Sequence, residues 1–339
     1  MTYERVLRIL KRNAQLRDLQ CSAAYPCYDT VWGAGGVKGY AEIGAYQAMI
    51  DLGIKIRKKR GVSVGAGNAL LISNGYTPRE MFELYERERE RLFDAAFWQT
   101  MYQDSLKAWM SIFGGDSTGF GQLFGMFERV NGKMIDTATF WQQALAVPNA
   151  MQWMKSQSFI SLERLWKSVI DKEGLTASDD LEIVAHCMKD GEPIFFKGTE
   201  YPLYKAVAGS GSLPGVFVPV EHDGHLLGDG AMFHYNPTEG LKEPSIVIRL
   251  GRATEWPSEP MTWLDAYYLW REIHLPMMPT TQDVDCDKHI VVDIPCSNVA
   301  GLAFGVSKTT RCALIEEGYR VTYETLTKEI EKGRIIVPA

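Results

Sequence analysis

Apolar and polar positions follow two different periods along the chain. Short apolar runs rich in β-branched or aromatic residues have the length of strands. These runs lie at 28–32, 181–187, 193–197, 216–220, 225–227, 245–250 and 289–294. Other segments repeat their apolar positions with the spacing of helices. These segments cover 3–19, 41–52, 78–93, 203–208 and 309–328. The alternation of the two patterns predicts a mixed α/β fold, and because no linker divides the chain we expect one domain over residues 1–339.

Composition excludes several classes of protein. The chain has 339 residues, of which 46% are hydrophobic, so it can bury a substantial core. A net charge of −6 argues against a nucleic-acid-binding protein, which would need a broad basic surface. The chain has no apolar run long enough to span a membrane and no secretory signal pattern, so we expect a cytoplasmic protein. Its six cysteines include no Cys-x-x-Cys pair. We therefore expect reduced thiols, no metal site and no cofactor.

The segment Gly61-Val-Ser63-Val-Gly65 has the pattern of a nucleophile elbow, followed by a helix-forming run. In such an elbow a serine lies on a tight turn between a strand and a helix, and its hydroxyl points into a cleft. Glycine is needed two residues before and two residues after the serine, because the strand and the helix approach each other closely there. The pattern is common by chance, so its meaning depends on the surrounding chain.

A glycine-rich loop at 33–39 follows the first predicted strand and precedes a helix. A P-loop requires lysine directly before serine or threonine, whereas here Lys38 precedes Gly39. A dinucleotide-binding loop requires a third glycine where Lys38 stands. An oxyanion hole fits better, because the amides of Gly35 and Gly36 would point at a developing negative charge. This interpretation also accounts for a serine elbow later in the chain.

Two segments near the elbow have an unusual composition. The strand entry at 54–60 is strongly basic, and we interpret it as a solvated surface rather than a contact with anionic lipid. Residues 94–175 are rich in tryptophan and methionine and form a predicted helical insert, a lid or cap beside the site. Such residues suit a membrane interface as well as the cores of ordinary helices. We therefore expect transient contact of the insert with a membrane surface.

Three motifs occur in a fixed order, namely Gly35-Gly-Val-Lys-Gly39, Gly61-x-Ser63-x-Gly65 and Asp229-Gly230-Ala231. Together they resemble the patatin-like phospholipase family. The stretch from Ser210 to Val220 is similar to the family segment that precedes the Asp-Gly motif. The resemblance covers about 28–80 and 180–330 and leaves the insert unmatched.

This resemblance implies a three-layer α/β/α sandwich with a mostly parallel central sheet, and hydrolysis of lipid acyl esters by a serine and an aspartate. It implies Ser63 as the nucleophile and Asp229 as its base. It also implies an oxyanion hole formed by the amides of Gly35, Gly36 and Val64. The residues expected to support these loops are Lys38, Gly39, Gly61, Gly65 and Gly230. The substrate implied is a phospholipid or lysophospholipid.

Two other functions remain open from the sequence. A conventional triad would use Ser63, an acid and a histidine, with His234, His274 or His289 as the base. Alternatively, the chain could be a catalytically silent lipid-binding protein or an effector that needs an activator. The intact motifs favour an enzyme over a silent binding protein.

Overall fold

The structure is a computed structural model. It describes residues 3–10, 26–92, 161–213, 217–232, 234–257, 269, 272–273 and 284–337. Most of the predicted insert at 94–175 and the end of the predicted helix at 3–19 lie outside these residues. No helix in the described ranges is long and apolar enough to cross a lipid bilayer.

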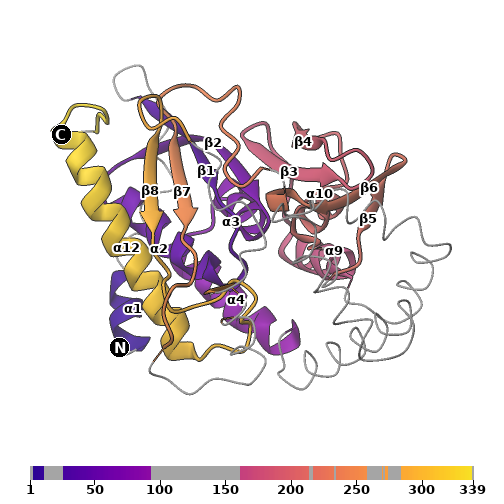
Figure 1. Cartoon of the computed structure of the whole chain (residues 1–339), viewed down its shortest axis with the longest axis horizontal. Coiled ribbons are helices and arrows are strands. Elements are labelled where there is room, and N and C mark those ends of the chain that lie inside the picture. The colour runs from indigo at the N-terminus through magenta and orange to yellow at the C-terminus, as the bar shows by residue number, and fades with distance from the viewer. Residues whose placement is uncertain are drawn as a thin grey trace, which may run out of the picture.

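A central, mostly parallel sheet organises the fold (Figure 1). Its strands follow the order β5-β6-β3-β2-β1-β7-β8, and β4 pairs with β3 beside this path. The strands β3, β2, β1, β7 and β8 run parallel, whereas β4 and β6 pair antiparallel with β3, and β5 pairs antiparallel with β6. Their bounds are β1 Cys27–Trp32, β2 Lys55–Val62, β3 Leu181–Cys187, β4 Pro193–Lys197, β5 Val220–His222, β6 His225–Asp229, β7 Ile246–Leu250 and β8 Ile290–Ile294.

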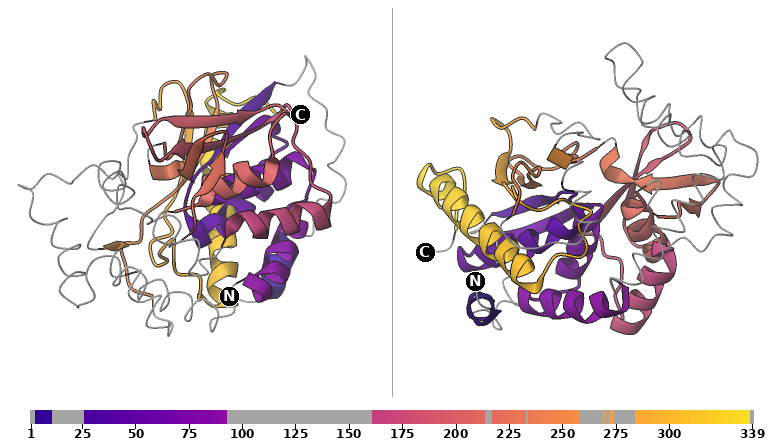
Figure 2. Two further views of the ribbon diagram at one scale, coloured as in Figure 1. Left: turned by 90° about the vertical axis from the view of Figure 1, so that its right-hand side faces the viewer. Right: turned by 60° about the horizontal axis from the view of Figure 1, so that its bottom comes forward.

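Helices cover one face of this sheet. Alternate residues of the strands, such as Trp32, Ile183 and Ile248, belong to one large apolar core together with residues of the helices. The helices are α1 Tyr3–Ile9, α2 Gly39–Asp51, α3 Val64–Ser73, α4 Pro78–Leu92, α9 Leu162–Glu173, α10 Leu203–Gly211 and α12 Lys308–Glu331. Figure 2 shows α12 along one side of this layer and α9 with α10 at the other end.

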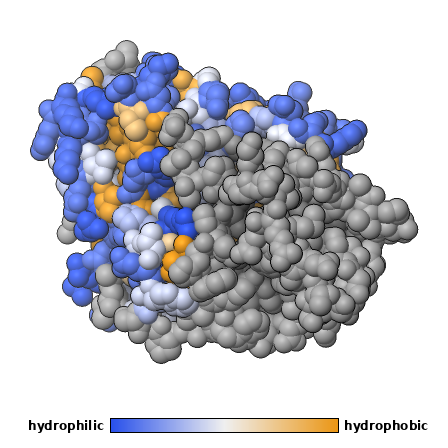
Figure 3. Space-filling view, viewed as in Figure 1, coloured by the Kyte–Doolittle hydropathy of each residue, from blue (hydrophilic) through white to orange (hydrophobic). Residues whose placement is uncertain are grey.

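The opposite face of the sheet carries smaller apolar clusters. Val31, Val247 and Val291 pack there with Leu241 and Val284 from connecting segments. Figure 3 shows apolar surface over the part of this face that β7 and β8 occupy. The mixed α/β fold that the sequence pattern predicts is therefore confirmed, as is the mostly parallel central sheet that the family resemblance implies.

One predicted strand is wrong in its position. The run 216–220 was expected to be extended, but β5 begins only at Val220. The reason lies in the hydrogen bonds just before it. The amide of Phe217 donates to the carbonyl of Leu213 at 3.0 Å, and Ser212 Oγ donates to the carbonyl of Val218 at 3.2 Å. These backbone groups therefore bind Ser212 and Leu213, just after α10, rather than a neighbouring strand.

The basic strand entry, predicted as a solvated surface, is partly exposed over Lys55–Lys58 but buried at Lys59 and Arg60. Arg60 is fully buried, and its Nε donates to the Glu182 carboxylate at 2.8 Å on the facing strand. Arg57 binds Asp29 at 2.7 Å through two nitrogen atoms, and Lys59 pairs with Asp180. The sequence shows the cations together but not the acidic partners, which come from distant segments. The charge of Arg60 is thus neutralised inside the protein, whereas Arg57 and Lys59 are neutralised closer to the surface.

Cysteine usage departs from the expectation at one position. Cys27 is disulfide-bonded, which corrects the prediction of a reduced thiol there. The thiols of Cys187, Cys286, Cys296 and Cys312 are free, and all of these except Cys286 are buried.

We predict that Glu182→Ala destabilises the fold strongly. The substitution leaves the Arg60 guanidinium buried without its carboxylate, so the free energy of unfolding should fall by about 3–5 kcal/mol in urea denaturation. A matched control is Glu324→Ala, which breaks a pair with Arg320 in which both side chains are 56% exposed. It should cost less than about 1 kcal/mol. Equal losses in the two variants would contradict the assignment.

Candidate active site

Ser63 lies between the end of β2 and the first residue of α3, in a strained backbone conformation. Its φ is 56° and its ψ is −122°, which a residue with a side chain rarely adopts. The structure therefore has the tight strand-to-helix turn that the Gly-x-Ser-x-Gly pattern predicts. Because Val64 is the first helical residue, its amide has no acceptor within α3.

The glycines around the elbow are required by close backbone contacts. A Cβ atom on Gly61 would lie 2.3 Å from the carbonyl oxygen of Gly65. A Cβ atom on Gly65 would lie 2.1 Å from the carbonyl oxygen of Trp32. After the acidic residue, a Cβ atom on Gly230 would lie 2.2 Å from the carbonyl oxygen of Val184. All three distances are too short for any side chain.

Strand β3 brings the serine and the aspartate together. Because β4 pairs with β3 over Glu182–His186, β2 and β6 must share the other edge of β3. Along that edge Val62 pairs with Val184, and the next residue, Ala185, pairs with Asp229. The strands β2 and β6 therefore approach each other end to end. Ser63 Oγ donates a hydrogen bond of 2.8 Å to Asp229 Oδ2.

The end of α10 positions the backbone of both residues. The Ser63 amide donates to Ser210 Oγ at 2.9 Å, and Ser210 Oγ donates to the carbonyl of Val184 at 2.5 Å. The amide of Asp229 donates to the carbonyl of Ser212 at 3.0 Å. The sequence pointed to this segment only through its resemblance and gave the two serines no role.

His186 is a second supporting residue that the sequence analysis missed. Its Nδ1 lies 2.6 Å from the carbonyl oxygen of Asp229 and therefore carries the proton of this hydrogen bond. Burial lowers the pKa of His186 to about 4, so the imidazole is neutral near pH 7. The other oxygen of the aspartate, Oδ1, accepts from the amide of Ala231 at 2.9 Å. Both the main chain and the carboxylate of Asp229 are thus held in place.

The glycine loop lies against the elbow. A Cβ atom on Gly39 would lie 2.3 Å from Val64 Cγ2, and one on Gly65 would lie 2.6 Å from the carbonyl oxygen of Gly33. Gly36 has a φ of +56°, and a Cβ atom there would meet the carbonyl oxygen of Gly301 at 2.1 Å. The backbone of the glycine loop therefore requires glycine at position 36.

Lys38 anchors the loop through its buried side chain. Its Nζ donates to the carbonyl of Gly251 at 2.8 Å and pairs with Glu272. Glu272 in turn accepts from the amides of Gly301 and Ala253, each at 2.8 Å. These contacts join the loop to the chain segments that follow β7 and β8. The sequence predicted a supporting lysine but gave no indication of Glu272.

Two buried carboxyl groups have raised pKa values near the site. Burial raises the pKa of Asp229 to about 6, although the Ala231 amide and the Ser63 hydroxyl oppose the shift. Burial also raises the pKa of Glu42 to about 8, against a hydrogen bond of 2.6 Å from Asn68 Nδ2. Asp229 is therefore ionised at neutral pH and close enough to its pKa to exchange a proton.

Of the histidines considered for a triad, His289 lies away from Ser63. His289 comes just before β8 and contacts Ser245 through Nδ1 at 2.8 Å. The strands β8 and β2 run in the same direction. His289 precedes β8 and Ser63 follows β2, so the two residues lie at opposite strand ends of the sheet. The amide of His234 donates to the carbonyl of Gly230, and His274 lies outside the described residues. Within the described ranges no histidine is hydrogen-bonded to Ser63 Oγ.

The three motifs lie within a segment that matches a known protein family. The family profile described as Patatin-like phospholipase matches residues 31–242, which include the glycine loop, the elbow and Asp229. The uncharacterized protein YqhO of Bacillus subtilis is 24% identical over 313 residues, or 87% of this chain and 96% of YqhO.

Two solved structures resemble this chain at low sequence identity. VipD from Legionella pneumophila has a TM-score of 0.48 and 14% identity, covering 95% of this chain and 73% of VipD. ExoU in its complex with SpcU, from the type III secretion system of Pseudomonas aeruginosa, has a TM-score of 0.42 and 16% identity. This match covers 91% of this chain and 52% of ExoU.

We predict that Gly65→Ala destabilises the protein by about 1–3 kcal/mol, because the new methyl group overlaps the carbonyl of Trp32. Chemical denaturation measures this loss. Gly211→Ala is the matched control, since its Cβ atom would meet only Leu162 Cδ1 at 3.4 Å. It should leave stability unchanged or raise it by up to about 1 kcal/mol. A stable Gly65→Ala protein would rule out the close contact.

We also predict that Asp229→Asn is more stable than wild type at pH 8. A raised pKa in the folded state means that Asp229 favours folding below its unfolded pKa and that this contribution is lost as pH rises through about 6. The variant should gain on the order of 2–3 kcal/mol over wild type at pH 8. Urea denaturation at pH 4 and pH 8 measures the difference, which should shrink at pH 4. A pH-independent difference would show that Asp229 is not a buried ionised group.

Proposed function

Because the chain belongs to the patatin-like phospholipase family, we propose that it hydrolyses a carboxyl ester of a phospholipid or lysophospholipid with Ser63 and Asp229. The observation that carries this proposal is the 2.8 Å hydrogen bond from Ser63 Oγ to Asp229 Oδ2. It joins a serine on a strained turn to a buried carboxylate, which is the geometry of a nucleophile and its base.

In the first half of the reaction Ser63 Oγ attacks the ester carbonyl while Asp229 accepts its proton. The resulting tetrahedral intermediate has a negatively charged oxygen. When it collapses, the bond to the leaving alcohol breaks, and Asp229 returns the proton to that alcohol. The products of this step are an acyl-serine ester and a lysolipid or another free alcohol.

In the second half a water molecule attacks the acyl-serine ester, and Asp229 again accepts a proton. Collapse of this intermediate releases the fatty acid and returns the proton to Ser63 Oγ. A carboxylate with a pKa of about 6 serves both directions of transfer, because it is ionised at neutral pH and still basic. His186 holds the main chain of this aspartate and stays neutral throughout.

The oxyanion would be stabilised by the amides of Gly35, Gly36 and Val64. The Val64 amide begins α3, so the positive end of the helix dipole adds to its hydrogen bond. The contact between Gly39 and Val64 keeps the glycine loop next to the elbow. Loss of one such donor in other hydrolases costs about 3 kcal/mol of transition-state stabilisation. Lys38 supports the loop through Glu272 and does not need to touch the substrate.

A dyad accounts for the contacts better than a triad does. Asp229 occupies the hydrogen-bonding position on Ser63 that the imidazole of a triad would take. The position of His289, before β8 and in contact with Ser245, also supports a dyad over a triad that uses this histidine. Since the substrates are bilayer lipids, we also propose transient contact with a membrane surface, for which the Trp- and Met-rich insert has the suitable composition.

We predict that wild type releases fatty acid from phospholipid vesicles and that Ser63→Ala abolishes release, because no nucleophile remains. Mass spectrometry of the lipid products measures release and identifies the acyl chain. The control is Ser245→Ala, which removes a buried hydroxyl that contacts His289. This variant should still release fatty acid. Release by Ser63→Ala at the rate of wild type would contradict the proposed nucleophile.

The rate should depend on pH through the ionisation of Asp229. We expect kcat/KM to rise as pH increases through about 6 and to level off above it, because only the ionised carboxylate accepts the serine proton. Below the pKa, each pH unit should lower the rate about tenfold. Initial rates on a soluble acyl ester between pH 4.5 and 8 provide the test. A rate independent of pH over this range would exclude Asp229 as the base.

A further inference from the structure

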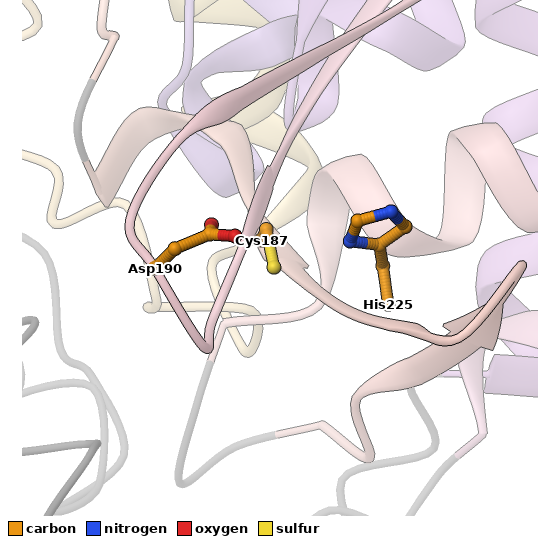
Figure 4. A group of neighbouring side chains, drawn as sticks. All are labelled: Cys187, Asp190 and His225. Atoms are coloured by element: carbon orange, nitrogen blue, oxygen red, sulfur yellow. The ribbon is translucent and has the colours of Figure 1, made fainter.

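We propose that Cys187, Asp190 and His225 form a binding site for a zinc-like transition-metal ion, separate from the Ser63 site. The sulfur of Cys187, a carboxylate oxygen of Asp190 and a ring nitrogen of His225 all lie within 4.8 Å of one another. Figure 4 shows the side chains of Asp190 and His225 on the two sides of Cys187. Thiolate, imidazole and carboxylate are the three donor types that bind zinc in proteins.

The backbone gives two of these donors a fixed separation. Cys187 ends β3 and Asp190 lies in the turn before β4, so the segment reads Cys-x-x-Asp-Gly. The amide of Gly191 donates to the carbonyl of Cys187 at 2.8 Å, and Gly191 has a φ of 79°. Paired zinc ligands are commonly separated by two to four intervening residues, and two residues separate Cys187 from Asp190.

The third donor comes from the neighbouring hairpin. His225 is the first residue of β6, and Cys187 pairs with Leu227 of the same strand. The amide of Met188 donates to the carbonyl of Leu226 at 2.8 Å, which ties the turn after β3 to β6. The two hairpins are therefore joined where the three donors meet, and only the side chains need to adjust around an ion.

Burial and charge suit this role. Cys187 is 1% exposed, whereas Asp190 and His225 are exposed and leave a path from solvent. The amide of Glu192 donates to Asp190 Oδ1 at 3.1 Å, which helps to hold this carboxylate in the turn. The ion would replace the thiol proton, which leaves to solvent, and the Asp190 carboxylate would then bind the ion in place of that proton.

The donor set also selects among metals. A thiolate and an imidazole favour zinc and similar transition metals, whereas calcium and magnesium require mostly oxygen ligands. Three protein ligands leave a fourth tetrahedral position for water. The ion would connect the turn at 187–190 to β6, the strand that ends at Asp229. Binding should therefore stabilise the part of the sheet that carries the base of the proposed dyad.

The test is a titration of chelator-treated full-length protein with Co²⁺, followed by competition with Zn²⁺. We expect wild type to bind one ion per chain with a near-ultraviolet thiolate-to-cobalt absorption band, and Zn²⁺ to remove the band and raise Tm. Cys187→Ser should lose the band. Asp190→Asn and His225→Gln change exposed side chains that the fold does not need, and each should weaken binding by about 10-fold or more.

Two controls match these substitutions. Cys286→Ser removes an exposed thiol elsewhere, and His222→Gln removes the histidine that pairs with His225 across the hairpin. Both should bind Co²⁺ as wild type does. The proposal is overturned if wild type shows no thiolate band, if the band survives in Cys187→Ser, or if the controls lose it as well. These readouts do not involve ester hydrolysis, so they stand whether or not Ser63 is a nucleophile.

Discussion

The end-to-end approach of β2 and β6 along one edge of β3 is the constraint on which the site depends. Strand β2 ends beside Val184 and β6 ends beside Ala185, so the residues at the two ends must meet. A parallel and an antiparallel neighbour share this edge, and the junction between them leaves room for a turn. Ser63 and Asp229 occupy that junction. Their hydrogen bond is therefore a consequence of strand register rather than of flexible side chains.

This junction requires support, because both residues are in unfavourable states. Ser63 has a strained backbone, and Asp229 is a carboxylate buried away from water. Hydrogen bonds from the end of α10 and from His186 hold their main chains in place. Two residue pairs before the end of the β2–β3 pairing, the buried Arg60 and Glu182 fix the register of β2 against β3. Stability elsewhere in the sheet thus compensates for strain at the site.

Local pattern predicts most of the elements, whereas distant contacts decide the rest. The Gly-x-Ser-x-Gly turn and the strand runs at 181–187 and 193–197 are visible in the sequence, because each depends on neighbouring residues. The burial of Arg60 could not be predicted, since its partner Glu182 is more than a hundred residues away. The role of His186 depends in the same way on a contact with Asp229. The candidate metal site combines the two cases, because Cys187 and Asp190 are neighbours and His225 is not.

The most direct measurement of the central claim is labelling by a fluorophosphonate, with the adduct located by mass spectrometry. The account predicts that the reagent modifies Ser63 in wild type and that Asp229→Asn lowers the labelling rate strongly, because the serine loses its base. Variants that lack His234, His274 or His289 should label at the rate of wild type. Labelling that persists in Asp229→Asn but disappears when one histidine is removed would contradict the dyad and establish a triad.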